Sequence, residues 1–179
     1  MNATPEPMEP LEDLRIAVSV GAAAQNSVQH ADTKAAVLLT GLAGMVALAA
    51  NQPGLPAAAM RAGAVATMGM IGLAAAIIVG TCVAGWHLGR CLAPRLTGPD
   101  RPDDAAGNRF ALPDLGARRG PVDPAPVEQQ RREAWAAAEV LAGIAMRKYQ
   151  AVRAGIPWTA VAVTGSVGWL CLAAAIGGQ

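Results

Sequence analysis

Apolar and polar positions divide the chain into long segments of different character. Residues 11–51 contain no proline; their first part, 11–34, is polar enough for water, whereas 35–51 holds only Thr40 and Asn51 as polar residues. Alanine and leucine recur through both parts, and both residues favour helix. The pattern therefore predicts one continuous helix, roughly 60 Å long at about 1.5 Å per residue. Only its second part suits the interior of a bilayer.

Two further apolar runs are long enough to cross a membrane. Residues 62–88 carry no formal charge apart from a potential one on His87, and they end near Trp86, which is typical of a membrane interface. Residues 156–177 also lack charged side chains. The segment 51–56 is rich in proline and glycine, which predicts a tight turn between antiparallel neighbouring helices.

Small residues recur at four-residue spacing within the second run, at Ala76, Gly80 and Ala84. This spacing lets helix backbones approach closely in lipid. General richness in alanine and glycine explains the same pattern, and the sequence leaves both interpretations open.

The chain changes character between the second and third apolar runs. A loop is predicted over 90–126, because its stretch 92–125 holds six prolines and charges of both signs. One short apolar patch, 108–115, either docks onto the helices or is a chance hydrophobic spot. Residues 127–153 then show apolar side chains at helical spacing, which predicts an amphipathic helix. Gly155 and Pro157 are expected to loosen or kink the chain after it.

Composition supports a membrane protein. Hydrophobic residues make up 53% of the chain and charged residues 15%, against about 25% charged residues in soluble domains. A soluble fold would leave few residues to cover three apolar runs. Residues 1–10 lack the positive start of a secretory signal, so no cleaved signal is expected and disorder is predicted there. We predict an all-α integral membrane protein with one domain, 11–177, made of stalks 11–34 and 127–153 and spans 35–51, 62–88 and 156–177.

The distribution of basic residues predicts the orientation. The chain has 14 lysines and arginines, of which only Arg61 lies between the first two apolar runs, and none follows Arg153. Basic residues favour the cytoplasmic side. The N-terminus, both stalks and the loop are therefore expected in the cytoplasm, and the C-terminus outside.

The sequence shows no enzymatic constellation. It has no glycine-rich phosphate loop, and its three cysteines and two histidines lack metal-ligand spacing, so neither an enzyme nor a metal site is expected. Cys91, beside Arg90, is either a packing residue or a reactive thiol. The three spans hold no ionisable residue in 35–51, 62–86 or 156–177, which argues against a dedicated ion pathway. No nucleic-acid partner is expected.

Two polar clusters at the predicted cytoplasmic membrane face are candidate ligand-binding sites. Asp32 points away from the helix face that its neighbours share and needs a partner, which is expected to be Arg147 or Lys148. The first cluster is either the polar collar of a membrane helix or part of a ligand site. The second either faces lipid and sets the topology or binds an anion. The candidate residues are Asn26, His30, Asp32 and Lys34 in the first cluster and Arg147, Lys148 and Tyr149 in the second.

These two stretches resemble a known family. The sequence HADTKA at 30–35 leads into one span, and AGIAMRKY at 142–149 leads toward another. Both are similar to the transmembrane effectors of Pycsar antiphage systems, and the patch 108–115 lies where that family tends to carry an aromatic residue and an aspartate.

The resemblance implies a function. Such effectors are bacterial inner-membrane proteins whose partner is a pyrimidine nucleotide cyclase, which makes cyclic CMP or cyclic UMP during phage infection. The effector, expected here as a homo-oligomer in the bilayer, responds by disrupting membrane integrity and so causes abortive infection. The resemblance implies that Lys34, Arg147 and Lys148 contact the nucleotide. A ligand-independent scaffold or accessory subunit, or a small constitutive channel, remains the alternative.

The orientation can be tested with single cysteines in a background without native cysteines. Gly54→Cys and Gly178→Cys should react with an impermeant maleimide in intact cells, because both positions are expected outside. Asp104→Cys should not react. Labelling at Asp104→Cys alone would invert the predicted orientation.

Overall fold

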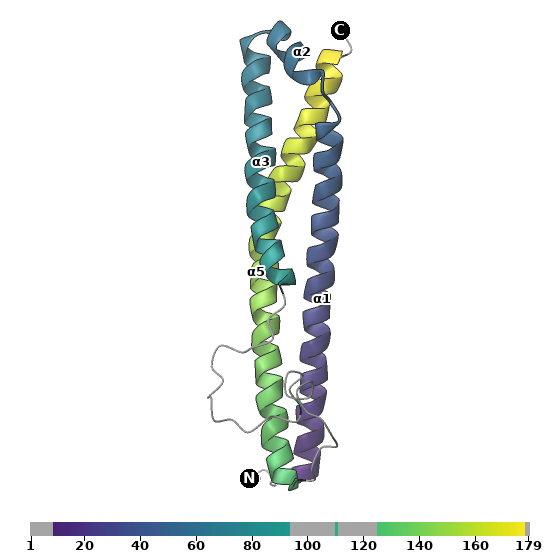
Figure 1. Cartoon of the computed structure of the whole chain (residues 1–179), viewed down its shortest axis with the longest axis vertical. Coiled ribbons are helices and arrows are strands. Elements are labelled where there is room, and N and C mark those ends of the chain that lie inside the picture. Colours follow the sequence, from purple (N-terminus) through teal and green to yellow (C-terminus); the bar gives the residue numbers. More distant parts are fainter. Residues whose placement is uncertain (1–8, 94–109, 111–124, 178–179) are drawn as a thin grey trace, which may run out of the picture. The chain divides into compact units, whose positions relative to one another are not determined.

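The computed structural model describes residues 9–93, 110 and 125–177, and these residues form helices without any strand. The apolar patch 108–115, apart from a half-buried Phe110, and most of residues 1–10 and of the predicted loop lie outside the described residues. The helices are α1 (Pro10–Ala50), α2 (Leu55–Ala62), α3 (Ala64–Leu92) and α5 (Val127–Gly177), drawn in Figure 1.

Helix α1 is a single continuous helix, which confirms the prediction of one helix through 11–51. It begins at Pro10, where a missing N–H costs nothing because the first turn has no helical acceptors for its donors. Glu12 and Asp13 lie in the first turn and favour the positive end of the helix dipole. The helix ends at Ala50, so the predicted last residue, Asn51, belongs to the turn.

Helix α5 joins the predicted second stalk and third span in one helix of 51 residues. Pro157 lies inside it and leaves the carbonyl of Arg153 without its usual helical donor. Two residues later, the Thr159 hydroxyl donates to the carbonyl of Gly155 at 3.0 Å. The helix does not end at Gly155 or Pro157, so the expected loosening of the chain does not interrupt it.

The connection between α1 and α3 differs from the predicted tight turn. The turn ends at Gly54, and the residues after it form the separate helix α2 (Figure 1). Pro56 lies in its first turn, and Leu55 and Ala59 are buried. Gly63, with φ of +107°, separates α2 from α3 in a conformation that side chains with a Cβ rarely adopt. The proline after Leu55 and the later glycine are the usual start and stop signals of a helix.

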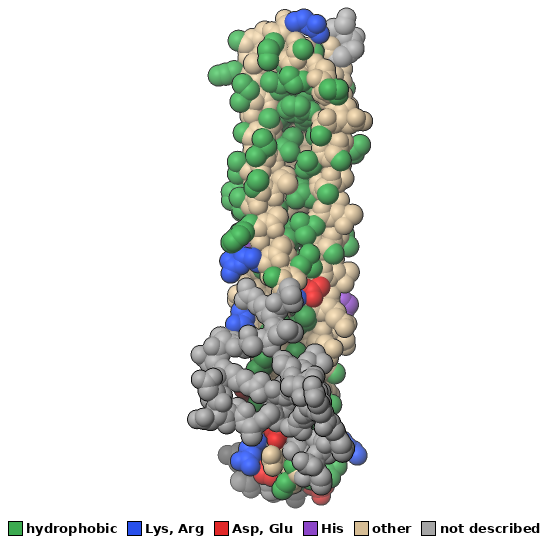
Figure 2. Space-filling model, viewed as in Figure 1, with side chains coloured by type: hydrophobic (Ala, Val, Ile, Leu, Met, Phe, Trp, Pro, Cys, Tyr) green, Lys and Arg blue, Asp and Glu red, His purple; other side chains and the backbone are tan. Residues whose placement is uncertain are grey.

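Helices α1, α3 and α5 are each long and apolar enough to cross a membrane. No more than 22% of the most apolar window of each helix is buried within the chain. On the face shown in Figure 2, apolar side chains lie on the surface of these helices, as expected for contact with lipid or with another apolar helix. Large exposed hydrophobic residues of α3 are Val65, Met68, Ile71, Ile78 and Val79. The division into stalks and spans and the orientation stay predictions.

The chain forms two compact units, and the boundary falls inside α1 after His30 and inside α5 after Arg147. In the first unit, α1 and α5 pack in parallel, since Asp13 contacts Arg131 and a Cβ at Gly21 would lie 3.9 Å from that of Ala138. Small buried side chains form this contact: Ala17, Ala134, Ala138 and Ala145.

The second unit has a core to which three helices contribute. Helix α3 runs antiparallel to α5, because Gly80 lies against Ala162 and Leu88 lies against Gly155. The buried core residues are Ala31, Ala35 and Leu42 from α1, Ala84, Leu88 and Cys91 from α3, and Val152 and Ala162 from α5.

Close approach of α3 and α5 depends on Gly80. A Cβ at this position would lie 2.8 Å from the backbone nitrogen of Ala162 and 2.9 Å from the carbonyl oxygen of Trp158. Such distances leave no room for any side chain. The recurrence of small residues at Gly80 and Ala84 therefore reflects helix packing, and both residues are buried.

Buried residues of α5 recur every seven positions. The series is Ala138, Ala145, Val152, Thr159 and Ser166. A seven-residue repeat keeps one stripe of a helix facing its neighbours, as in coiled coils. Most members are small, and the hydroxyls of Thr159 and Ser166 donate to carbonyls of their own helix, at 3.0 and 2.9 Å. The stripe thus needs no polar partner from another helix.

The glycine contact predicts the effect of one added methyl group. Gly80→Ala should destabilise the protein by about 1–3 kcal/mol, because the helices must separate to admit it. Gly85→Ala is the matched control on the same helix, since a Cβ there meets nothing within 4 Å. Thermal unfolding in detergent measures both; equal melting temperatures for the two variants would contradict the close contact.

Candidate functional site

Asp32 and Lys148 form an ion pair in the second unit. The Nζ atom of Lys148 lies 2.5 Å from Oδ1 of Asp32, and the two side chains are 11% and 36% exposed. Asp32 follows buried Ala31 on α1, and Lys148 precedes buried Val152 by one helical turn on α5. Of the two partners expected for Asp32, the structure pairs it with Lys148.

Cys91, one residue before the end of α3, completes this cluster. Its side chain is fully buried. The Sγ atom lies 3.9 Å from Oδ1 of Asp32 and 3.8 Å from the carbonyl oxygen of Ala31, so the thiol acts as a weak donor to both. Its burial favours packing over the reactive role considered for it. Spacing carried a signal, because Cys91 follows buried Ala84 and Leu88 at helical intervals.

Lys148 occupies a position where a charge is costly. It lies seven residues before Gly155 and fourteen before Ala162, both of which face the core of the second unit. A lysine at such a position between packed helices lowers stability. Where one occurs, it typically fixes the alignment of the helices or has a function. The carboxylate of Asp32 offsets part of this cost by neutralising the ammonium.

Lys34 and Tyr149 form a second contact in the same unit. The ammonium of Lys34 lies 5.7 Å from the centre of the Tyr149 ring, within range of a cation–π interaction. Both side chains are exposed. Among the residues that the structure describes, Lys34 makes no ion pair, so this cation and this ring are open to a ligand from solvent.

The other three candidate residues belong to the first unit. Asn26 and His30 are exposed on α1. Arg147 is half-buried on α5, and its Nε atom is buried with no hydrogen-bond partner in the described part of the chain. The structure therefore brings together Asp32, Lys34, Lys148 and Tyr149 within one unit. A single ligand site containing all seven residues stays a prediction.

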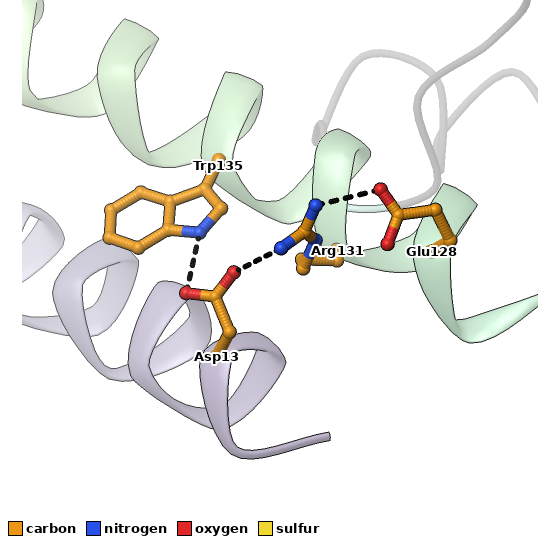
Figure 3. Close-up of polar contacts among 4 residues, drawn as sticks. All are labelled: Asp13, Glu128, Arg131 and Trp135. Carbon is orange, nitrogen blue, oxygen red and sulfur yellow. Dashed lines mark hydrogen bonds and ion pairs between the residues drawn. The ribbon is translucent and has the colours of Figure 1, made fainter. Parts of the chain in front are cut away.

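A separate polar cluster joins α1 and α5 in the first unit (Figure 3). Asp13 accepts hydrogen bonds from Arg131 at 3.0 Å and from the indole Nε1 of Trp135 at 3.2 Å. Arg131 also pairs with Glu128 at 2.7 Å. These bonds, that to Glu128 first, raise the pKa of Arg131 above its ordinary value. The cluster is a structural clasp, because its donors and acceptors already satisfy one another.

The sequence analysis missed this clasp. It predicted an amphipathic helix over 127–153 without assigning a partner to Arg131 or Trp135. The spacing of Arg131 and Trp135, four residues apart, does put both on one helix face. Their partner Asp13 lies 118 residues before Arg131, and no local pattern reveals such a pairing.

Comparison with known families decides the identity. A family model described as the Pycsar effector protein domain matches residues 17–177. The chain belongs to the Pycsar effector family. The matched region includes the Asp32–Lys148 pair and the Lys34–Tyr149 contact. Searches of curated proteins and of solved structures found no match. Together with three helices able to span a membrane, membership in this family indicates a membrane effector of an antiphage system.

The clasp predicts a stability effect in the first unit of the effector. Asp13→Ala removes the acceptor shared by Arg131 and Trp135 and should destabilise the protein only modestly, because Arg131 is solvated. Glu12→Ala changes an exposed neighbour and should have little effect. The measurement is limited proteolysis of α5 near Trp135; identical cleavage rates in the two variants would show that the clasp contributes nothing.

Proposed function

We propose that this Pycsar effector responds to cyclic CMP or cyclic UMP and then disrupts membrane integrity, causing abortive infection. The observation that carries the proposal is the exposed contact of Lys34 with Tyr149, in a chain that belongs to this family over 17–177. This contact offers a cation and an aromatic ring at one place. A cyclic pyrimidine mononucleotide has the matching groups, a phosphodiester anion and a flat base.

The charges near this contact favour Lys34 as a phosphate ligand. Lys148 is already neutralised by Asp32, whereas Lys34 makes no ion pair within the described residues. The ring of Tyr149 is free on its exposed side to stack on a base. Arg147 is a second candidate cation, because its buried Nε lacks a hydrogen-bond partner. A guanidinium binds phosphate through paired N–H groups, which a lysine cannot offer.

The setting of the site follows from the predicted orientation. We place the stalks 11–34 and 127–153 in the cytoplasm and the spans in the bacterial inner membrane, with the C-terminus outside. The nucleotide then comes from a cytoplasmic pyrimidine nucleotide cyclase, and the effector itself is not an enzyme. Because so little of each apolar window is buried within one chain, several copies are expected to assemble in the bilayer.

The proposal is tested by dye uptake into cells that express the effector with or without an active cyclase. Lys34→Ala should lose the cyclase-dependent uptake, because it removes the proposed phosphate ligand, and Arg147→Ala tests separately whether the first unit also supplies a cation needed for the response. Arg132→Ala, an exposed arginine of α5 in the first unit, is the matched control and should keep it. If neither cyclic CMP nor cyclic UMP raises dye uptake with the unmodified protein, the sensor function is wrong and a scaffold takes its place.

Variants of Tyr149 separate base stacking from lipid anchoring. Tyr149→Phe keeps the ring and should keep the response, whereas Tyr149→Leu keeps an apolar side chain and should lose it. Membrane fractionation shows whether each variant inserts. A residue that only anchors the helix at the headgroups would tolerate both changes.

A further inference from the structure

The ammonium of Lys148 already holds an anion that belongs to the chain. The carboxylate of Asp32 lies within hydrogen-bond distance of it, and the Cys91 thiol contacts the same carboxylate oxygen. The three residues come from α5, α1 and α3, so all three long helices contribute to this point of the second unit. The pair lies at the edge of the apolar core cluster, beside its members Ala31 and Cys91.

Exposure of the two partners is unequal. The side chain of Lys148 is 11% exposed and that of Asp32 is 36% exposed. Solvent therefore reaches the carboxylate more readily than the ammonium. Because little of the Lys148 side chain reaches solvent, an anion from solvent gains access to its ammonium most directly by taking the place of Asp32.

We propose that the Asp32–Lys148 pair is an autoinhibitory latch, in which Asp32 occupies the site of an activating phosphodiester. The latch rests on the proposed function, since the competing anion is the phosphate of the cyclic mononucleotide held by Lys34 and Tyr149. Binding exchanges one anion for another on Lys148. The exchange frees Asp32 from α5 while the buried ammonium stays neutralised.

Release of the pair acts on the packing of the second unit. Asp32 lies next to Ala31, and Cys91 contacts the backbone of that same residue. Ala31, Cys91 and Val152, one turn after Lys148, all belong to the core cluster. Movement of Asp32 away from α5 thus loosens contacts among three helices. A ligand that binds only the loosened arrangement shifts the population toward it.

The first test measures dye uptake in cells that contain no cyclase. Asp32→Asn should raise uptake several-fold over the unmodified effector, because it leaves a buried ammonium without its anion and so disfavours the latched packing. Glu139→Gln removes one negative charge from an exposed position of α5 and should leave uptake low. Adding Lys148→Met to Asp32→Asn should return uptake toward the unmodified level, because no unpaired charge remains.

The second test measures binding of radiolabelled cyclic CMP and cyclic UMP to purified protein in detergent. Asp32→Asn should bind about tenfold more tightly if the unlatched state holds about a tenth of the resting population. Unchanged affinity together with low uptake by Asp32→Asn would overturn the latch while leaving the response of the unmodified protein intact. The opposite outcome is that Asp32→Asn raises dye uptake although the protein responds to neither nucleotide. That outcome would refute the nucleotide assignment and support the latch.

A third test leaves the pair unaltered, so it does not depend on folding of the Asp32 variants. In a Cys82→Ser/Cys171→Ser background, Cys91 is the remaining thiol. Buried beside Asp32, it should react slowly with N-ethylmaleimide in membranes at rest, and several-fold faster when the nucleotide is added. A nucleotide that triggers dye uptake without changing the reactivity of Cys91 would contradict release at this point.

Discussion

The second unit depends on the close approach of its helices, which small side chains allow. Gly80 meets the backbone around Ala162 at distances that leave no room for a Cβ, and Gly155 lies in tight contact with the side chain of Leu88. In lipid, apolar side chains gain little by leaving one apolar surrounding for another, so van der Waals contact between well-fitted helices carries the association. These contacts hold α3 and α5 together in antiparallel order.

A lysine between such closely packed helices is informative, because the packing of the helices would be more stable without it. Lys148 stands at a core position of α5 and needs Asp32 to offset its desolvation. A methionine or leucine at this position would pack against the same core without needing a charged partner. The matched family domain, residues 17–177, includes this residue. The first unit, in contrast, places its charges in a clasp near the surface, around Asp13.

Much of the helical content could be predicted from the sequence, since long apolar runs mark α1, α3 and α5 plainly, although the proline inside α5 hid the continuity of that helix. Helix α2 was missed because Pro56 was interpreted as part of a turn, although a proline after Leu55 suits a first helical turn equally well. The partner of Asp32 was narrowed to Arg147 or Lys148, adjacent residues that helix geometry points about 100° apart. Choosing between them needs the rotation of α5, which packing at Ala138, Val152 and Ser166 determines. The seven-residue repeat of buried residues in α5 was not predicted, because alanine, serine and threonine differ little in hydrophobicity from the residues around them.

The smoothness of the α5 stripe has a mechanical consequence. Helices that pack through leucines resist sliding past one another, because each large side chain must leave the gap that it fills between residues of the partner helix. Alanine, serine and threonine project little, and here the hydroxyls of Thr159 and Ser166 are turned back to their own helix. Such a surface has shallow ridges, so outside the close contact at Gly80 its side chains add little to the steric difference between neighbouring registers. Directional contacts such as ion pairs then decide which register of the helices is populated. A single charged pair therefore has a large influence on how the helices align.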